Sequence, residues 1–143
     1  HVGLNPTVAK LMNAGALELI LVPQGTLAEQ IRAKGAGLGG VLTPTGLGTL
    51  VQEGKQVIEV DGKKYILEKP MKADLAIVEA TYADTFGNGV NIGTTRNFNP
   101  LMALAADVVV MGTYEVREPG KVDPSSVTIH GVLVDYLVEI VEA

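Results

Sequence analysis

A stretch near the front of the chain joins a helix-forming segment to a loop of unusually high glycine content. The motif Pro23-Gln24-Gly25-Thr26-Leu27 follows an apolar run, and six of the fourteen residues from 35 to 48 are glycine. Glycine loses more conformational freedom on folding than any other residue, so this loop is costly to order. Such a cost is usual where the backbone passes close to a ligand or another chain. The sequence therefore directs attention to 35–48 as a candidate binding region.

The composition excludes several classes of protein. Hydrophobic residues make up 47% of the 143 residues, which is enough for one globular domain over 1–143. The net charge of −5 and the lack of a basic run argue against nucleic-acid binding. Without cysteine the chain has no disulfide or thiolate chemistry. No apolar run reaches the length of about 18 residues that suggests a membrane span, and we expect a cytoplasmic protein without a membrane segment.

Capping residues and apolar periodicity predict the helices. Asn5 is a capping residue followed by proline at the first helical position, and Gly15 is a stop signal. The second helix should bury Leu27 and Ile31 on one face. Asn97 or Asn99 is the candidate cap of the third. The three predicted helices cover 6–14, 26–34 and 100–106.

Short apolar runs predict the strands. The best local signal is Asp61-Gly62 between two alternating segments, which favours a two-residue hairpin turn. The other runs lack alternation, as in strands that are buried on both faces of a parallel sheet. The predicted strands cover 17–22, 57–60, 63–67, 73–82, 90–93, 107–111 and 132–140. The alternation of strands and helices predicts an α/β fold with a largely parallel sheet, flanking helices and an antiparallel hairpin decoration.

The glycine loop does not match a dinucleotide-binding fingerprint in its context. Gly35, Gly37 and Gly40 satisfy the G-x-G-x-x-G spacing. In that fingerprint the glycines follow a strand and open a helix. Here they follow a helix and lead into Thr43-Pro44-Thr45-Gly46, so we set the nucleotide interpretation aside.

The chain offers hydrogen-bond donors but no convincing nucleophile or base. His1 and His130 are isolated, no acidic cluster has metal-ligand spacing, and Ser125 lies in a polar connector. We therefore predict no metal site. Neutral polar side chains are suited to orienting a substrate or to stabilising a developing oxyanion, and roles as caps or turn formers remain equally open for each. These are Gln24, Thr43, Thr45, Asn97 and Asn99.

Several motifs in one order resemble the alpha subunit of the family I CoA-transferases, which include acetate/butyrate–acetoacetate and succinyl-CoA:3-oxoacid CoA-transferases. The resemblance begins at Pro23-Gln24-Gly25-Thr26-Leu27 with Glu29 and Ile31-Arg32, and covers nearly the whole chain. It continues through Gly-Ala-Gly, Thr43-Pro44-Thr45-Gly46, Gly48-Thr49, Val51–Lys55, Tyr65–Glu68, Ala73–Ala76, Gly87-Asn88 and Arg96–Pro100. The family's N-terminal Gly-Gly-Phe signature is absent, so the resemblance implies the C-terminal portion of the subunit, with the CoA-transferase-like open α/β fold.

The family resemblance implies a covalent ping-pong mechanism. A glutamate in a Ser-Glu-Asn-Gly motif of the beta subunit would form a glutamyl-CoA thioester, and this chain has no such motif. Gln24 occupies the position of the family's oxyanion glutamine. Coenzyme A would be a substrate and not a cofactor, and the partners would be the beta subunit in an alpha2beta2 heterotetramer and the missing N-terminal segment. The implied substrate-binding or CoA-binding residues are Gly25, Gly35, Gly37, Thr43, Thr45, Gly46, Asn97 and Asn99.

Two other functions are consistent with the fold class alone. A non-catalytic module that binds acyl-CoA or another small ligand, or that serves in assembly, would need no nucleophile of its own. An isomerase of the related phosphosugar fold would need an acid and a base, which we do not find in the sequence. A partner chain that contains Ser-Glu-Asn-Gly would favour the transferase.

Overall fold

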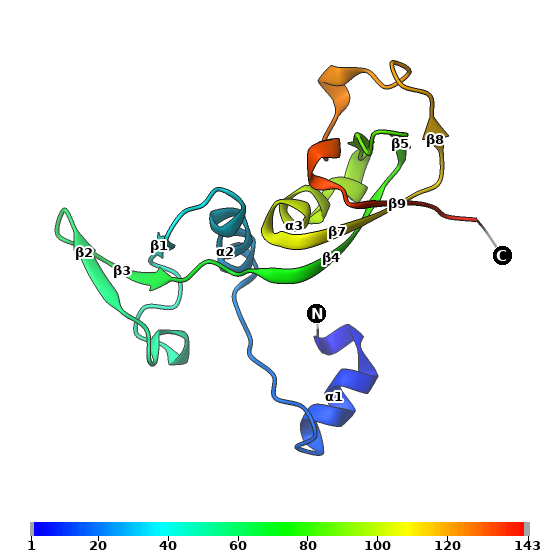
Figure 1. Ribbon diagram of the computed structural model, residues 1–143. Coiled ribbons are helices and arrows are strands. Elements are labelled where there is room, and N and C mark those ends of the chain that lie inside the picture. The colour runs from blue at the N-terminus through cyan, green and yellow to red at the C-terminus, as the bar shows by residue number, and fades with distance from the viewer. Residues whose placement is uncertain (1, 142–143) are drawn as a thin grey trace.

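A parallel sheet of three strands lies at the centre of the computed structural model, which describes residues 2–141 (Figure 1). Its order is β4 (Ala73–Ala80), β7 (Ala106–Thr113) and β9 (Tyr136–Glu139). Helix α3 (Asn99–Ala105) lies between β4 and β7 in the chain and packs against one face of the sheet. The predicted α/β fold with a parallel sheet is confirmed.

The main core forms between the central sheet and α3. Alternate residues of β4 point inward and are almost completely buried, as the two-residue period of a strand requires. Small side chains dominate this layer, so α3 can pack close to the strands. The buried cluster comprises Ala76, Val78, Ala80, Ala83, Ala103, Val109, Met111 and Ile129.

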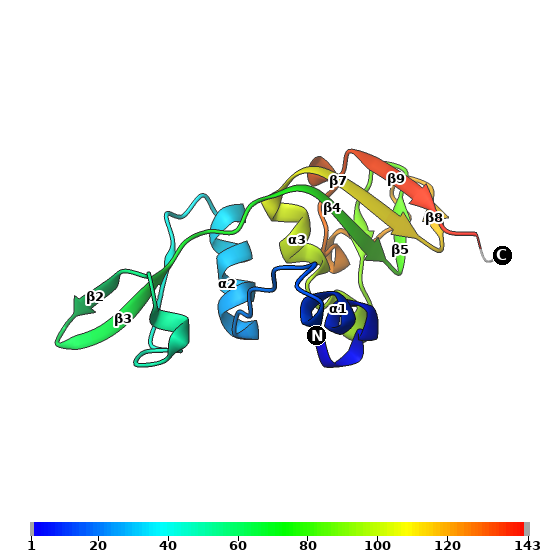
Figure 2. The same cartoon turned by 90° about the horizontal axis from the view of Figure 1, so that it is seen from below.

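The opposite face of the central sheet has no helix over it among the described residues. Figure 2 shows α1 (Pro6–Asn13), α2 (Gln24–Gly35) and α3 on the same side of the sheet. On the other side, Ile77 is 70% and Tyr136 is 62% exposed. Parallel sheets are normally covered on both faces, so the described residues give only one of the two layers that such a sheet usually has.

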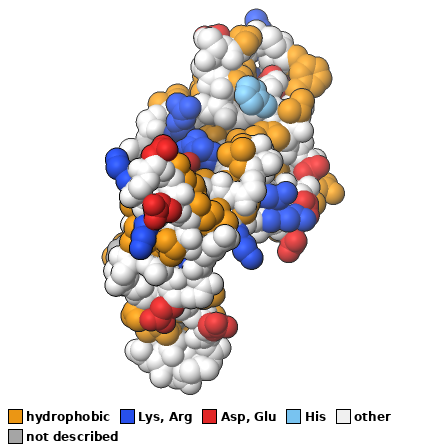
Figure 3. Space-filling model, turned by 90° about the vertical axis from the view of Figure 1, so that its left-hand side faces the viewer, with side chains coloured by type: hydrophobic (Ala, Val, Ile, Leu, Met, Phe, Trp, Pro, Cys, Tyr) orange, Lys and Arg blue, Asp and Glu red, His pale blue; other side chains and the backbone are white. Residues whose placement is uncertain are grey.

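A small antiparallel sheet lies at one end of the molecule, in the order β1 (Val41–Thr43), β3 (Lys63–Glu68) and β2 (Val57–Val60). Asp61 and Gly62 both have positive φ, 50° and 73°, so the predicted hairpin turn is confirmed. Strand β1 was not predicted because three residues inside a glycine-rich loop are too few to show a period. Figure 3, which looks onto this end, shows acidic, basic and apolar side chains intermixed.

A third sheet lies at the other end, in the order β6 (Gly89–Val90), β5 (Tyr82–Asp84) and β8 (Val116–Arg117). The side chain of Asp84 accepts hydrogen bonds from the backbone N–H groups of Phe86 and Asn88, at 3.0 and 2.9 Å. This closes the turn that leads into β6. The predicted strand over 73–82 is in fact two strands, β4 and β5, and the predicted strand near 90–93 is limited to β6.

The first helix agrees with its capping signals. The backbone N–H of Val8 donates to Asn5 Oδ1 at 3.1 Å, and Pro6 is the first residue of α1. Gly15 has a φ of 67° directly after the helix, as a terminating glycine does. Five short 3₁₀ turns connect other elements of the described chain, at Val2–Leu4, Leu50–Gln52, Gly93–Arg96, Pro124–Ser126 and Gly131–Leu133.

The predicted strand over 17–22 is wrong. This segment has no regular secondary structure and pairs with no strand of the described chain, and Ile20 is 77% exposed. An apolar run indicates that a segment prefers burial, but a strand also needs a neighbour for its backbone hydrogen bonds. The central sheet ends in the edge strands β4 and β9, but the run over 17–22 pairs with neither of them.

Three further predictions need correction. Asn97 and Asn99 do not cap α3, because its capping position is Phe98, which makes no side-chain cap bond. The fully buried positions of α2 are Thr26, Gln30 and Ala33, whereas Leu27 and Ile31 are half-buried. The predicted strand over 132–140 is shortened to β9 because Gly131–Leu133 forms a 3₁₀ turn.

Candidate functional site

Gln24 is the first residue of α2, and its side chain lines an apolar groove of about 770 Å³. Among the described residues, Gln24 supplies the one polar side chain of this lining. Gln24 is exposed in the described chain, as are Ile20 and Leu21 at 77% and 73%, so the groove is open to solvent. The other lining residues are Gly3, Leu19, Ile20, Leu21, Val22, Leu27, Met71 and Phe98.

The backbone at this end of α2 adds to the donor character of the site. Pro23 occupies the capping position and makes no side-chain cap bond, and the first turn carries no acidic residue. The first N–H groups of a helix have no partner within the helix, and the helix dipole places partial positive charge there. Gln24 and these backbone groups therefore lie at an end of α2 that favours negative charge.

A second, smaller groove of about 350 Å³ brings together three of the residues predicted from the sequence, Gly25, Thr43 and Thr45. One wall is the start of α2 and the other is β1 with the residues that follow it. The Thr43 hydroxyl accepts a hydrogen bond from the backbone N–H of Thr45 at 3.1 Å, which fixes the local turn. The remaining lining residues are Pro23, Thr26, Glu29, Val41 and Leu42.

Glu29 is the carboxylate that lines the smaller groove. It forms an ion pair with Arg32 on the same helix, 3.1 Å from Nε to Oε2, and both side chains are about half exposed. A solvated ion pair of this kind lacks the desolvation that activates a carboxylate for chemistry. We therefore assign Glu29 no catalytic role.

Three glycines of the predicted binding loop line neither groove. A Cβ at Gly35 would lie 2.5 Å from Leu104 Cβ, so this glycine permits the close crossing of α2 and α3. A Cβ at Gly46 would lie 2.7 Å from Val51 Cγ1. Gly37 has open space around it and a φ of 69°. Local packing explains Gly35 and Gly46 without a ligand, and the binding role of all three stays a prediction.

The two predicted asparagines also lie outside both grooves. The Asn99 side chain accepts a hydrogen bond from the backbone N–H of Glu79 at 3.1 Å and donates to the Thr95 carbonyl at 2.7 Å. These bonds attach the start of α3 to β4. Asn97 is exposed and has a φ of 25°. The residue between them, Phe98, does line the Gln24 groove, and sequence reasoning did not single it out.

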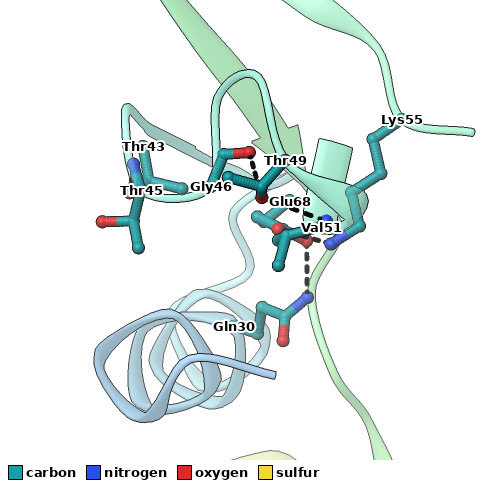
Figure 4. A network of polar contacts seen from close by, with 8 residues as sticks. All are labelled: Gln30, Thr43, Thr45, Gly46, Thr49, Val51, Lys55 and Glu68. Carbon is teal, nitrogen blue, oxygen red and sulfur yellow. Dashed lines mark hydrogen bonds and ion pairs between the residues drawn. The ribbon is translucent and has the colours of Figure 1, made fainter. Parts of the chain in front are cut away.

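The structure adds a buried polar network that sequence reasoning did not find (Figure 4). The Glu68 carboxylate, with 3% of its side chain exposed, lies 2.7 Å from Lys55 Nζ. It also accepts a hydrogen bond from Gln30 Nε2 at 3.1 Å. Glu68 lies one residue beyond the predicted strand over 63–67, and no local pattern pairs residues that are 13 and 38 positions apart.

The ionisable groups whose pKa values are shifted line neither groove. A hydrogen bond from Arg117 lowers the pKa of Glu115, and the same bond raises the pKa of Arg117. A hydrogen bond to Asp107 raises the pKa of Lys72, and bonds from Ser125 lower the pKa of Asp123. Within residues 2–141, no group of three or more His, Asp or Glu side chains could hold a metal ion. Over the same residues, no helix is both long and apolar enough to cross a membrane.

The fold and the grooves thus define an α/β protein that presents an amide and helix-end donors beside an apolar surface. The chain belongs to the coenzyme A transferase family, whose model matches residues 1–140. It is 49% identical over 138 residues to the acetate CoA-transferase subunit alpha of Escherichia coli K12, covering 96% of this chain. It is 45% identical over 139 residues to the acetoacetyl-CoA:acetate/butyrate CoA transferase alpha subunit of Clostridium acetobutylicum, covering 97% of this chain.

These comparisons also define how much of a subunit the chain represents. The match spans 63% of the Escherichia coli protein and 64% of the Clostridium protein. Among solved structures, an acyl-CoA transferase from E. coli O157:H7 in a thioester complex with CoA superposes with a TM-score of 0.85 at 25% identity. That match covers 96% of this chain and 31% of the other. The chain therefore corresponds to less than two thirds of each of these proteins.

Proposed function

We propose that this chain is the alpha-subunit part of a CoA-transferase that moves CoA between an acyl-CoA and a short-chain carboxylate or 3-oxoacid. The observation that carries the proposal is Gln24, an amide at the N-terminus of α2 in an apolar groove, in a chain of the coenzyme A transferase family. The relatives whose names include acetate, butyrate and 3-ketoacid support this range of acyl groups.

The proposed chemistry uses a carboxylate that this chain does not supply. A glutamate of the beta subunit attacks the acyl-CoA carbonyl and releases the CoA thiolate, which leaves a mixed anhydride. The thiolate then attacks the glutamyl carbonyl, releases the first carboxylic acid as its carboxylate, and forms a glutamyl-CoA thioester. The second carboxylate substrate repeats these steps in reverse order. Coenzyme A is a substrate throughout, and no further cofactor is required.

Gln24 acts on the tetrahedral intermediates of these steps. Each attack places a negative charge on the former carbonyl oxygen, and preorganised donors stabilise this charge without reorganising. The Gln24 amide N–H donates to that oxygen, and it needs no change of protonation state to do so. Gly25, Thr43 and Thr45, which line the smaller groove, are proposed to bind substrate next to it.

The proposal extends to assembly and location. The active enzyme would combine this chain, the remainder of the alpha subunit and the beta subunit in an alpha2beta2 heterotetramer in the cytoplasm. "Subunit alpha" and "alpha subunit" in the names of the two relatives support a hetero-oligomer. Native mass spectrometry of the purified complex tests this arrangement. After acyl-CoA is added, a beta chain present in equal amount should gain the mass of CoA less one water when its intact mass is measured under denaturing conditions.

Substitution of Gln24 tests the oxyanion role. We expect Gln24→Ala to lower kcat by about 10²–10³, because one oxyanion donor is lost. Gln24→Glu should lower kcat further, since it places a carboxylate beside the oxyanion. Gln56→Ala is the matched control, because Gln56 is exposed and lines neither groove. Activity of Gln24→Ala within twofold of the unmodified complex would sink the assignment, and a chain that binds acyl-CoA without turnover would favour the binding module.

A further inference from the structure

The network around Glu68 joins three segments that are distant in the sequence. Glu68 is the last residue of β3, Lys55 lies two residues before the start of β2, and Gln30 lies in the middle of α2. Each carboxylate oxygen has its own partner, with Lys55 at Oε1 and Gln30 at Oε2. Figure 4 shows the two donors reaching the carboxylate from different elements. The carboxylate of Glu68 therefore connects β3 to α2 through Gln30 and to the segment before β2 through Lys55.

Net stability is a weak explanation for this arrangement. A buried ion pair often contributes no more than well-packed apolar side chains of the same volume, because both charges lose water. In addition, Gln30 Oε1 is buried without a hydrogen-bond partner among the described residues. The Gln30 side chain therefore donates from Nε2 to Glu68 while its Oε1 accepts no hydrogen bond from the described residues. Charge-assisted hydrogen bonds are shorter and about twice as strong as neutral ones, which suits a role in fixing geometry.

The geometry in question is that of the two grooves. Glu68 lies opposite Val41 in the β1–β3 pairing, and Val41 is in the wall of the smaller groove. Gln30 belongs to the helix whose first residues, Gln24 and Gly25, line the larger and the smaller groove. A second bond on the same side of α2 joins the Met71 N–H to the Gln30 carbonyl at 3.0 Å. The hydrogen bonds of Gln30 to Glu68 and Met71 thus hold α2 close to the end of β3, where β3 pairs with β1.

We propose that Glu68 is a positioning residue, which holds α2 against the paired strands β1 and β3 through Gln30, is itself held by Lys55, and thereby fixes the start of α2 that carries Gln24. This inference rests on the proposed CoA-transferase function. It requires no contact between Glu68 and substrate. Because an error of about 1 Å in the placement of a catalytic group can cost 10²-fold in rate, loss of Glu68 should lower kcat more than it raises KM.

The first experiment compares Glu68→Met with Glu68→Gln in the complete alpha–beta complex. Methionine keeps the length of the side chain and removes both acceptor oxygens, whereas glutamine keeps one. We expect kcat to fall at least about tenfold in Glu68→Met, with KM within about threefold, and Glu68→Gln to recover most of the activity. Glu115→Met is the matched control, because it removes an exposed ion pair on another sheet.

The second experiment asks whether Glu68 acts through Gln24. In a complex that already carries Gln24→Ala, Glu68→Met should lower kcat by less than about a further twofold, since there is no longer an amide to position. A residue that only stabilises the fold would cost the same factor in both backgrounds, and that result would overturn the proposal. If Glu68→Met does not fold, Lys55→Met replaces it in both experiments with the same expectation, because Lys55 is partly exposed.

The outcomes separate this inference from the function on which it rests. An unmodified complex that transfers no CoA would refute the proposed function, and the positioning role with it. An active unmodified complex with a fully active Glu68→Met variant would refute the positioning role alone. A tenfold loss that disappears in the Gln24→Ala background supports both.

Discussion

Gly35 is the position at which one added carbon should have the clearest effect on the packing of this protein. It lies at the last residue of α2, where the helix crosses α3. A Cβ there would lie 2.5 Å from Leu104 Cβ, 3.2 Å from the Leu104 carbonyl oxygen and 3.3 Å from its carbonyl carbon. These atoms belong to the backbone or are directly attached to it. A change of side-chain rotamer therefore does not relieve the clash.

The magnitude follows from two opposing terms. Carbon atoms pack best at about 3.5–4.0 Å, so the helices must separate by roughly 1 Å at this point. Overpacking of this kind costs about 1–3 kcal/mol. Gly35 has an ordinary helical φ, and replacing glycine by alanine inside a helix gains at most about 1 kcal/mol. We therefore expect Gly35→Ala to lower the free energy of unfolding by up to about 2 kcal/mol, and by about 1 kcal/mol at the middle of the overpacking range.

Urea unfolding of the purified protein, followed by circular dichroism, measures this change. The matched control is Gly25→Ala, in the same helix, where an added Cβ has no atom within 4 Å. Its free energy of unfolding should stay unchanged or rise by up to about 1 kcal/mol, because the added Cβ meets no atom and alanine favours the helix more than glycine does. If Gly35→Ala proves as stable as Gly25→Ala, the close helix crossing does not exist in solution and the structural explanation of Gly35 is wrong.

Two further predictions concern polar contacts. Asn99→Ala should lower the free energy of unfolding by about 1–3 kcal/mol, because the N–H of Glu79 loses its acceptor; an unchanged urea midpoint would contradict this. Ser125→Ala should raise the pKa of Asp123, which the Ser125 hydroxyl and N–H hold below its usual value. A lowered folded pKa gives stability above the unfolded pKa that is lost as pH falls through the folded value. The difference in stability between the two proteins should therefore disappear at acid pH. If NMR gives the same titration of the Asp123 carboxyl in both proteins, the assignment of Ser125 as its hydrogen-bond donor is wrong.

Local sequence signals predicted the elements that depend on near neighbours. Asp61 and Gly62 supply the positive φ angles of the hairpin turn, and Asn5 with Pro6 begins α1. In both cases the interacting groups are within three residues of each other in the chain. Such contacts form wherever those residues occur, so the sequence is sufficient to predict them.

Elements that depend on distant partners were not predictable in this way. The apolar run over 17–22 has the composition of a strand, but no described strand pairs with it. The burial of Gln30 instead of Ile31 on α2 follows from the position of Glu68, 38 residues further along the chain. Periodicity reports which residues prefer burial. It does not report which other segment will lie against them.

The sequence by itself determined the family, the α/β class and the candidate role of Gln24, because these follow from residue types in a fixed order. Only the tertiary structure decided which of the candidate site residues lie next to one another. It placed Gly25, Thr43 and Thr45 in one groove and Gln24 in another, and it explained Asn99 by hydrogen bonds to the backbone. It also assembled the Gln30–Glu68–Lys55 network from three separate segments. The physical reason is that burial and hydrogen bonding depend on distance in space, which residue spacing fixes only over a few positions.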